Sequence, residues 1–329
     1  MNKYYKKWFL PLSAPAIILF FLVVFVPFII GVFYSFTAWK GTFFLNGKIA
    51  TSNPFEAFVG LQNYVDAVNN EKFQIAFGNT IKFTVIAVVA INVTALLLAL
   101  MLTSIKKFAG FFRVVFFMPN LLGGLALGFI WQFIFEVVFS QIFFGPDGLV
   151  SVEFLTNMTQ GGLKSIFALV ILVAWQMVGY MMIIYVAGLN NISDDLYEAA
   201  QIDGAGVVRT FISVMLPNAR GVITTVALFA FVWQWNDVYY TSMYEVSGDT
   251  YPMLTAKLVT MSERVAALIL QPQYVNIVKT IGEGITKNAL FTETLLNTAA
   301  LLIMTPLLIA YLFVQRLFIE GVERSGIVG

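Results

Sequence analysis

Several polar and aromatic side chains interrupt or directly follow long apolar stretches of this chain. Gln176 and Tyr180 lie within one uncharged run, and Trp235, Asn236 and Asp237 stand at the end of another. Polar groups inside a bilayer are costly, and by default they face a bundle interior or a water-filled path. Amides and a carboxylate beside flat aromatic rings suit a hydroxyl-rich ligand. We therefore take these five as candidate pathway residues; the alternative at each is an interhelical hydrogen bond, worth roughly 0.6 to 2 kcal/mol.

Catalytic and metal-binding side chains are scarce in this sequence. The chain contains no histidine and no cysteine, so the commonest proton relay, disulfides and thiolate metal ligands are missing. The apolar runs hold no paired carboxylates and no nucleophile beside a base, and no Gly-x-x-x-x-Gly-Lys-Ser/Thr phosphate loop occurs. The net charge of +1 argues against a nucleic-acid partner. We expect no enzyme activity, no metal and no cofactor.

The composition is that of a membrane protein. Of the 329 residues, 59% are hydrophobic and 11% charged, whereas about a quarter are charged in soluble domains. About twenty apolar residues cross the hydrocarbon core. Six uncharged runs fit this length to varying degrees, and the sequence predicts an all-α integral membrane protein with six transmembrane helices, at Trp8–Trp39, Phe83–Ile105, Val114–Phe135, Ser165–Ser193, Gly221–Asn236 and Thr294–Gln315.

The ends of the first run and the placement of basic residues predict the orientation. The first run is too long for a cleaved signal peptide, so we expect an uncleaved span bent or bounded by Pro11, Pro15 and Pro27. With the N-terminus in the cytoplasm, ten of the 19 Lys and Arg residues lie inside and nine outside. The bias becomes ten to five when the long loop after the fifth run is set aside, because long loops obey the rule poorly. Both termini are then cytoplasmic.

A charged segment, 192–217, comes after the fourth run and should lie in water beside the membrane. Asp195 can cap a first short helix, with Glu198 as its capping-box partner. Gly204 can end that helix, because glycine enters the left-handed conformation without steric cost. Pro217 suits the first turn of the next helical segment. The segment predicts two short helices joined by a corner, and an ordinary connecting loop is the alternative to a docking surface.

The spacing of this segment resembles a known family. Glu198-Ala199-Ala200, then Gly204, then Val214-Met215-Leu216-Pro217 is similar to the EAA loop of binding-protein-dependent ABC transporter permeases. Val214 stands where isoleucine is usual, and Ser193 where proline often opens the helix. In that family the loop inserts into a groove on a cytoplasmic ATPase. The resemblance implies the type I importer permease fold and ATPase-coupling roles for Glu198, Ala199, Ala200, Asp203, Gly204, Leu216 and Pro217.

A second motif narrows the expected substrate class. Val59-Gly60-Leu61-x-Asn63-Tyr64, followed by Asn79-Thr80, resembles the carbohydrate-type branch of these permeases, such as the maltose and multiple-sugar permeases. The alternative is a surface helix, Gln62–Asn69, on the outer interface. A Gly124-x-x-x-Gly128 pair in the third run favours close helix packing.

These motifs and runs together predict the organisation of the chain. Residues 1–77 form an N-terminal span and the first outer loop, 78–318 a core of five spans, and 319–329 a cytoplasmic tail. Within the core, 192–217 is the coupling loop. The outer loop 244–293 includes an amphipathic helix with Leu254, Leu258, Met261, Val265 and Leu268 on one face.

The resemblance implies a function. The chain would be one membrane subunit of an ATP-driven importer in a bacterial cytoplasmic membrane, translocating a sugar or oligosaccharide. Its partners would be a second, similar permease in a heterodimer, a cytoplasmic ABC ATPase dimer and an extracytoplasmic solute-binding protein. The alternative is a stand-alone ion-coupled secondary transporter or channel, which would need buried acidic or histidine coupling sites.

Overall fold

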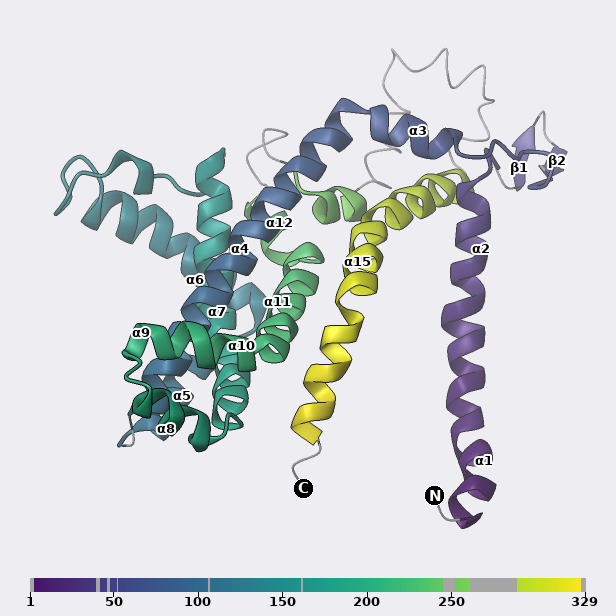
Figure 1. Ribbon diagram of the computed structural model, residues 1–329. Coiled ribbons are helices and arrows are strands. Elements are labelled where there is room, and N and C mark those ends of the chain that lie inside the picture. The colour runs from purple at the N-terminus through teal and green to yellow at the C-terminus, as the bar shows by residue number, and fades with distance from the viewer. Residues whose placement is uncertain are drawn as a thin grey trace. The chain divides into compact units, whose positions relative to one another are not determined.

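The computed structural model describes residues 3–39, 42–45, 48–51, 53–105, 107–160, 162–244, 252–260 and 289–326. Most of the described chain is helical (Figure 1). Its elements are α1 (Lys3–Phe20), η1 (Phe21–Phe25), α2 (Val26–Ser35), β1 (Thr42–Leu45), β2 (Lys48–Thr51), α3 (Gln62–Asn69), α4 (Glu71–Ser104), α5 (Ala109–Phe117), η2 (Met118–Leu121), α6 (Gly124–Phe133), η3 (Ile134–Phe143), η4 (Glu153–Leu155), α7 (Leu163–Asn190), α8 (Asp194–Ile202), α9 (Val207–Thr210), η5 (Phe211–Met215), α10 (Leu216–Asn218), α11 (Arg220–Trp235), α12 (Tyr239–Tyr244) and α15 (Ala289–Gly326).

Five helical stretches in the described residues are long and apolar enough to cross a membrane, and a sixth arises if the segments Val207–Asn218 and Arg220–Trp235, bent by 72°, count as one. The five are Pro11–Ser35, Glu71–Ser104, Gly124–Phe143, Leu163–Asn190 and Thr294–Arg316. This agrees with the predicted class of an all-α membrane protein with six spans. The chain divides into two compact units, Met1–Gln74 with Leu258–Thr305 (unit 1) and Ile75–Lys257 with Pro306–Gly329 (unit 2).

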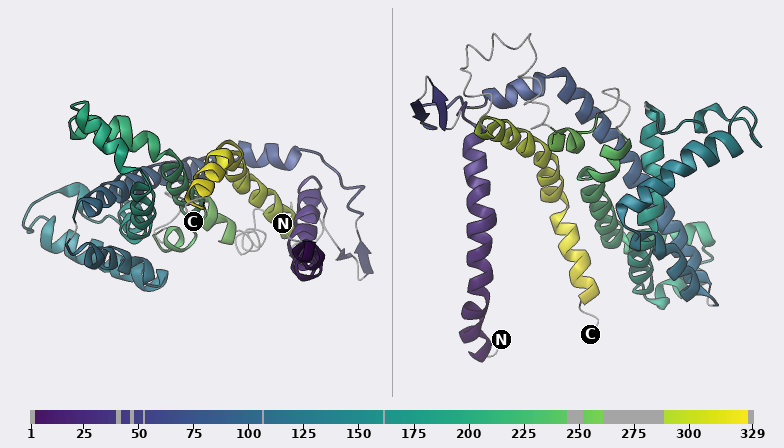
Figure 2. Two further views of the ribbon diagram at one scale, coloured as in Figure 1. Left: turned by 60° about the horizontal axis from the view of Figure 1, so that its bottom comes forward. Right: turned by 180° about the vertical axis from the view of Figure 1, so that it is seen from behind.

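In unit 1 the first span is one rod, seen best in Figure 2. Helices α1 and α2 are joined by the π-helical turn η1, which ends two residues before Pro27 in the first turn of α2. Proline cannot donate a backbone hydrogen bond and its ring crowds the carbonyl four residues earlier, so a widened turn at this point relieves the conflict. The span ends at Ser35, four residues before the predicted Trp39.

A polar cluster in unit 1 holds the end of α2. The Asn63 side-chain amide donates to the backbone oxygens of Ser35 and Thr37, both at 2.8 Å, and the hydroxyls of Ser35 and Tyr64 lie 2.6 Å apart. The Thr298 hydroxyl donates to the Ser35 oxygen at 3.5 Å. Asn63 and Tyr64 belong to α3, whose bounds match the surface helix considered from the sequence.

Unit 1 also contains a short hairpin that the sequence did not lead us to predict. Strand β1 pairs antiparallel with β2, Thr42 opposite Thr51 and Leu45 opposite Lys48. Threonine, phenylalanine and isoleucine are common in strands because their side chains fit a pleated, half-buried surface. The hydropathy of this loop, between two apolar runs, gave no sign of it.

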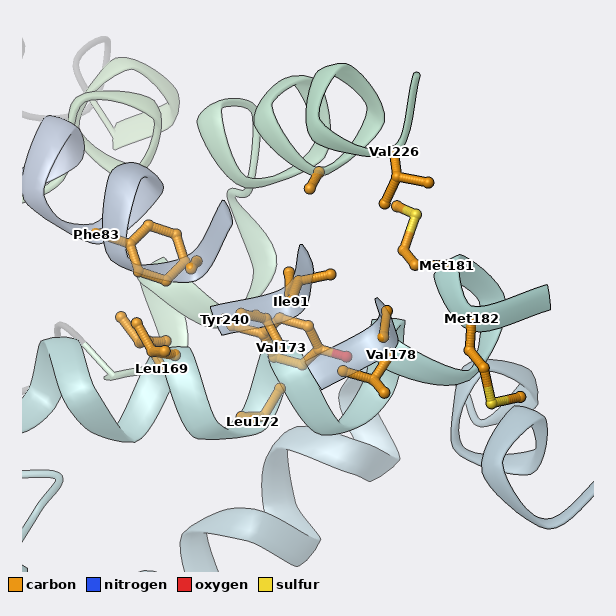
Figure 3. Packing of buried hydrophobic residues seen from close by; sticks show 14 of the residues in the cluster. Phe83, Ile91, Leu169, Leu172, Val173, Val178, Met181, Met182, Val226 and Tyr240 are labelled. Carbon is orange, nitrogen blue, oxygen red and sulfur yellow. The ribbon is translucent and has the colours of Figure 1, made fainter. Parts of the chain in front are cut away.

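Unit 2 is built around α7. Its buried side chains pack with those of α4, α11 and α12, and Figure 3 shows Phe83, Ile91, Leu169, Val173 and Tyr240 among them. The predicted Gly124-x-x-x-Gly128 contact is confirmed: a methyl group on Gly124 would touch Tyr239 and Tyr240, and one on Gly128 would overlap the Met243 sulfur. The missing side chains let α12 approach α6.

The predicted third span is wrong in its bounds. Val114–Phe135 is divided between α5 and η2 on one side and α6 with η3 on the other, and the membrane-length stretch begins at Gly124. Pro119 is in the first turn of η2, and Gly123 is extended at φ −62°, ψ 136°. Proline removes a hydrogen-bond donor that a continuous helix would need. Hydropathy alone does not predict such a break, because the residues on both sides of it are apolar.

Two predicted segments reach past the described residues. In the outer loop 244–293, residues 254–260 are helical and include Leu254 and Leu258, whereas Met261, Val265 and Leu268 lie outside the described residues. Helix α15 continues to Gly326, into the segment predicted as a tail.

Candidate functional site

The charged segment after α7 opens with a capped helix. Ser193 is the N-cap of α8, and its hydroxyl accepts a hydrogen bond from the Asp195 backbone N–H at 3.4 Å. The cap predicted from the sequence was Asp195, which instead occupies the first turn with Asp194. Acidic side chains there still suit the positive end of the helix dipole. The cap is two positions earlier than predicted, so the capping box of Asp195 with Glu198 does not form.

Gly204 ends α8 as predicted. Its φ is +70°, and the Gly204 and Ala205 N–H groups donate to the oxygens of Gln201 and Ala200 at 3.0 and 2.9 Å. This pair of bonds is a Schellman motif, in which the left-handed residue is usually glycine. A methyl group on Gly204 would meet no atom within 4 Å. Within this chain, glycine is therefore needed here for its backbone conformation and not for space.

The corner presents apolar side chains to its surroundings. Ile202 is 79% exposed, Val207 88% and Val208 71%. Apolar side chains this exposed on an otherwise polar loop are typical of an interaction surface. Beside them, Glu198, Ala199, Asp203 and Gly204 are exposed, whereas Ala200 is buried.

The other side of α8 contacts the body of unit 2. Tyr197 packs against the buried cluster. Burial, and secondarily the negative charge of Asp194, raises the pKa of the Tyr197 phenol above its ordinary value. The phenol is therefore neutral near pH 7, as a side chain that anchors a helix to an apolar core requires.

The second half of the loop is less regular than expected. Instead of the single short helix predicted after the corner, it consists of α9, the π-helix η5 and α10. Val207 is almost fully exposed while Phe211 and Val214 are half-buried, so the three do not share a face. Pro217 lies in the first turn of α10, as predicted, with Leu216 half-buried beside it.

Two of the candidate pathway residues, both on α7, contact polar or aromatic side chains of α11 and α12. The Tyr240 hydroxyl donates to the Gln176 side-chain oxygen at 2.9 Å. The Tyr180 ring lies 5.4 Å from that of Trp233, measured between centroids. Trp233 is 39% exposed and was not among the site residues predicted from the sequence. Its position four residues before Asp237, one turn earlier on a helix, was the available signal.

The other three candidates have partners within the chain. Trp235 is 2% exposed and packs against Phe77 and Phe231. The Asn236 amide donates to the Val232 oxygen at 2.8 Å. The Asp237 carboxylate accepts the N–H groups of Tyr240 at 3.4 Å and Thr241 at 2.9 Å, both in the first turn of α12.

The comparisons with known proteins bear on this arrangement. The model of the family "Binding-protein-dependent transport system inner membrane component" matches residues 91–324. The chain belongs to this family. The matched range contains the whole of the corner between α8 and α9, so the resemblance inferred from the spacing around Glu198 and Gly204 is confirmed at the level of the family.

Relatives and solved structures agree with this assignment. The permease is 38% identical over 230 residues to the probable starch degradation products transport system permease protein AmyD of Thermoanaerobacterium thermosulfurigenes, covering 69% of this chain and 73% of that protein. It is 33% identical over 231 residues to the multiple sugar-binding transport system permease protein MsmF of Streptococcus mutans, covering 70% and 74%. A chain of a bacterial alginate ABC transporter, solved in complex with an alginate pentasaccharide-bound periplasmic protein, superposes with a TM-score of 0.67 at 18% identity, over 95% of this chain and 94% of that one. The superposition shows a shared fold.

Proposed function

We propose that this permease is one membrane subunit of an ATP-driven importer for a sugar or oligosaccharide. ATP is hydrolysed on a separate cytoplasmic ABC ATPase dimer, the second membrane subunit is a similar permease, and a solute-binding protein delivers the substrate from outside. The names of AmyD and MsmF, which refer to starch degradation products and multiple sugars, support the substrate class. The orientation has both termini in the cytoplasm, as the distribution of basic residues favours.

The observation that carries the proposal is the exposed apolar corner after α8. Exposed Ile202, Val207 and Val208 surround the Schellman turn at Gly204. Full burial of one valine or isoleucine side chain is worth about 1.5–3 kcal/mol, so a partner that covers this corner gains substantial affinity. We propose that the ATPase is this partner.

We expect some residues of the coupling loop to contact the ATPase and others to maintain the shape of the loop. Glu198, Ala199, Asp203, Gly204 and Pro217 are exposed and would contact the ATPase directly. Ala200 is buried and Leu216 half-buried, and these two would hold the loop in its shape. The hydrogen-bonded turn at Gly204 makes the corner rigid enough to transmit a movement of the ATPase to α7 and α11.

The sugar pathway is proposed along the faces of α7, α11 and α12 in unit 2. Gln176 and Tyr180 offer an amide and a phenol next to exposed Trp233, a combination that can hydrogen-bond and stack on a sugar. Asn236 is exposed and would add a second amide. Trp235 and Asp237, which pack against other rings and cap α12, would act by positioning these groups.

The test is reconstitution. The permease is purified alone and with its co-expressed partners, and uptake of a labelled oligosaccharide into proteoliposomes is measured with and without ATP. Uptake that needs the partners, the binding protein and ATP supports the proposal. Uptake by the permease alone without nucleotide would overturn it in favour of a stand-alone transporter.

A substitution localises the ATPase contact. Val208→Glu places a charge on the exposed corner and should reduce co-purification of the ATPase. Val150→Glu is the matched control, because Val150 is 59% exposed in unit 2 but lies in the loop between η3 and η4. Equal ATPase recovery with both variants would contradict the assignment of the corner.

A further inference from the structure

The turn between α4 and α5 has an unusual backbone. Phe108, at its centre, has φ +67°, and among the described residues only Asn157 shares a positive φ without being glycine. For a bulky side chain this region is sterically costly and marks a site worth examining. The Phe108 ring is 65% exposed, and the Lys107 ammonium lies 5.6 Å from its centroid. The strained turn thus places an aromatic ring and a cation together at the surface.

Helix α5 continues this surface with two different faces. Phe116 lies on the inner face, and a methyl group on Gly179 of α7 would overlap its carbonyl oxygen, so the two helices are in close contact. The opposite face is apolar and open: Phe111 is 64% exposed, Val114 67% and Met118 56%. These residues are spaced three and four apart, so they form one stripe.

The charged residues of this turn and of α5 are all basic. From Lys72 to Phe135 the sequence contains no aspartate or glutamate. Arg113 is half-buried on α5, and no described residue accepts a hydrogen bond from its buried Nε. A buried donor without an acceptor is unfavourable. Lys107 and Arg113 are therefore two cations on a turn and helix whose own sequence supplies no acidic side chain.

We propose that Lys107, Phe108, Phe111, Arg113, Val114 and Met118 form a binding surface for anionic phospholipids of the cytoplasmic leaflet. The phosphate of a lipid headgroup pairs with Lys107 and Arg113, while the apolar stripe lies against its acyl chains. Basic side chains at the membrane surface each contribute attraction to anionic lipids, and long cationic side chains reach the headgroup level from an apolar helix.

The position in the fold favours a lipid over the ATPase. The turn comes directly after the span Glu71–Ser104, where the chain leaves the membrane. In unit 2 it lies at the same end as α8, so it shares the membrane side of the coupling loop (Figure 1). The cytoplasmic assignment of that side rests on the proposed function. The apolar stripe is continuous with a membrane span, which a lipid fits and a water-soluble subunit does not.

The experiment uses the assembled importer in nanodiscs. Because this chain has no native cysteine, Gly110→Cys gives it a single thiol, and a Cβ at Gly110 meets no atom within 4 Å. A fluorophore on this thiol is quenched by brominated phosphatidylglycerol or by brominated phosphatidylcholine, each diluted in unbrominated phosphatidylcholine. Quenching by the anionic lipid should exceed quenching by the neutral one, by roughly fivefold for each basic side chain that contributes.

Charge variants identify the source of the preference. Lys107→Gln and Arg113→Gln should each remove roughly fivefold of it, and Lys107→Arg should retain it. Lys72→Gln, at the other end of α4, is the matched control and should leave the local quenching unchanged. Lys107 is exposed, so Lys107→Gln alone keeps the test decisive if the Arg113 variant fails to assemble.

Two results would overturn the proposal. One is equal quenching by both lipids. The other is a label that soluble iodide quenches and that the ATPase shields, which would assign the surface to the ATPase. Sugar uptake is measured in the same preparation. If uptake is intact but no lipid preference is found, the lipid-binding surface is refuted and the proposed function stands. If a lipid preference is found without ATP-dependent uptake, the proposed function is refuted.

Discussion

Substitution of Gly204 separates backbone strain from a docking role. The residue has φ +70°, where an L-amino acid pays about 1–2 kcal/mol. A Cβ there meets no atom within 4 Å, so the chain itself imposes no size limit. Gly204→Ala, Gly204→Leu and Gly204→Trp should therefore destabilise the isolated permease by the same amount, and Gly204→Asn by less, because asparagine tolerates this conformation.

The ATPase should respond differently to the same series. If the ATPase covers the corner, a larger side chain at position 204 pushes it away from Ile202 and Val207. Loss of one such buried side chain, about 1.5–3 kcal/mol, weakens association roughly ten- to a hundredfold. Co-purification and uptake should thus fall in the order Ala, Leu, Trp.

Two assays decide between these effects. Thermal unfolding of the isolated permease reports the strain, and recovery of the ATPase with ATP-dependent uptake reports the docking. The reasoning is refuted if the bulky variants bind the ATPase as well as Gly204→Ala does. It is also refuted if unfolding temperatures fall with side-chain size, because the space around Gly204 would then be closed within the chain.

Three further tests, which use four substitutions, probe the packing within each unit. Asn63→Ala removes two hydrogen bonds to backbone oxygens at the end of α2, and the loss of about 1–3 kcal/mol should appear as faster proteolysis of unit 1. Gly179→Ala forces a methyl group onto the Phe116 oxygen and should cost about 1–3 kcal/mol, read as a lower unfolding temperature; an unchanged temperature would refute the close approach. Tyr240→Phe and Gln176→Leu should show a coupling of about 1 kcal/mol in a double-mutant cycle of unfolding, and additive effects would mean that the bond is not made.

The class of fold could be predicted from the sequence because hydropathy and length are local. The fifth apolar run, Gly221–Asn236, matches α11 to within one residue at each end. Gly204 could also be placed, since its requirement is a property of a single backbone position. The features that could not be predicted from local sequence depend on contacts with other helices. The break before Gly124 separates α5 from α6, and α5 lies against Gly179, more than fifty residues later in the chain.

The candidate site could be predicted only in part, because its contacts also join different helices. The pairing of Gln176 with Tyr240 joins α7 to α12, and no spacing in the sequence encodes it. Trp235 and Trp233 look equivalent in the sequence, yet one is buried and the other exposed, because neighbouring residues on a helix point in different directions. The N-cap shifted from Asp195 to Ser193 because both residue types cap well, so local propensity does not choose between them.

The motif that suggested a sugar substrate has structural contacts of its own. In unit 2 the Asn79 amide donates to the Pro252 oxygen at 3.3 Å, and the Thr80 hydroxyl accepts the Leu254 N–H at 3.0 Å. Both side chains are buried. They hold the segment before residues 254–260 against α4, and their burial keeps both side chains away from a passing sugar.

A last prediction concerns Asn79. Asn79→Ala leaves the Pro252 oxygen without its donor, which costs about 1–3 kcal/mol, and should lower the yield of assembled importer. Selectivity should not change, so the ratio of uptake rates for two oligosaccharides should equal that of the unaltered protein. Gln176→Leu is the comparison, because Gln176 is a proposed pathway residue and its loss should alter that ratio. If Asn79→Ala changes selectivity and Gln176→Leu does not, the pathway follows α4 and its assignment to α7 is wrong.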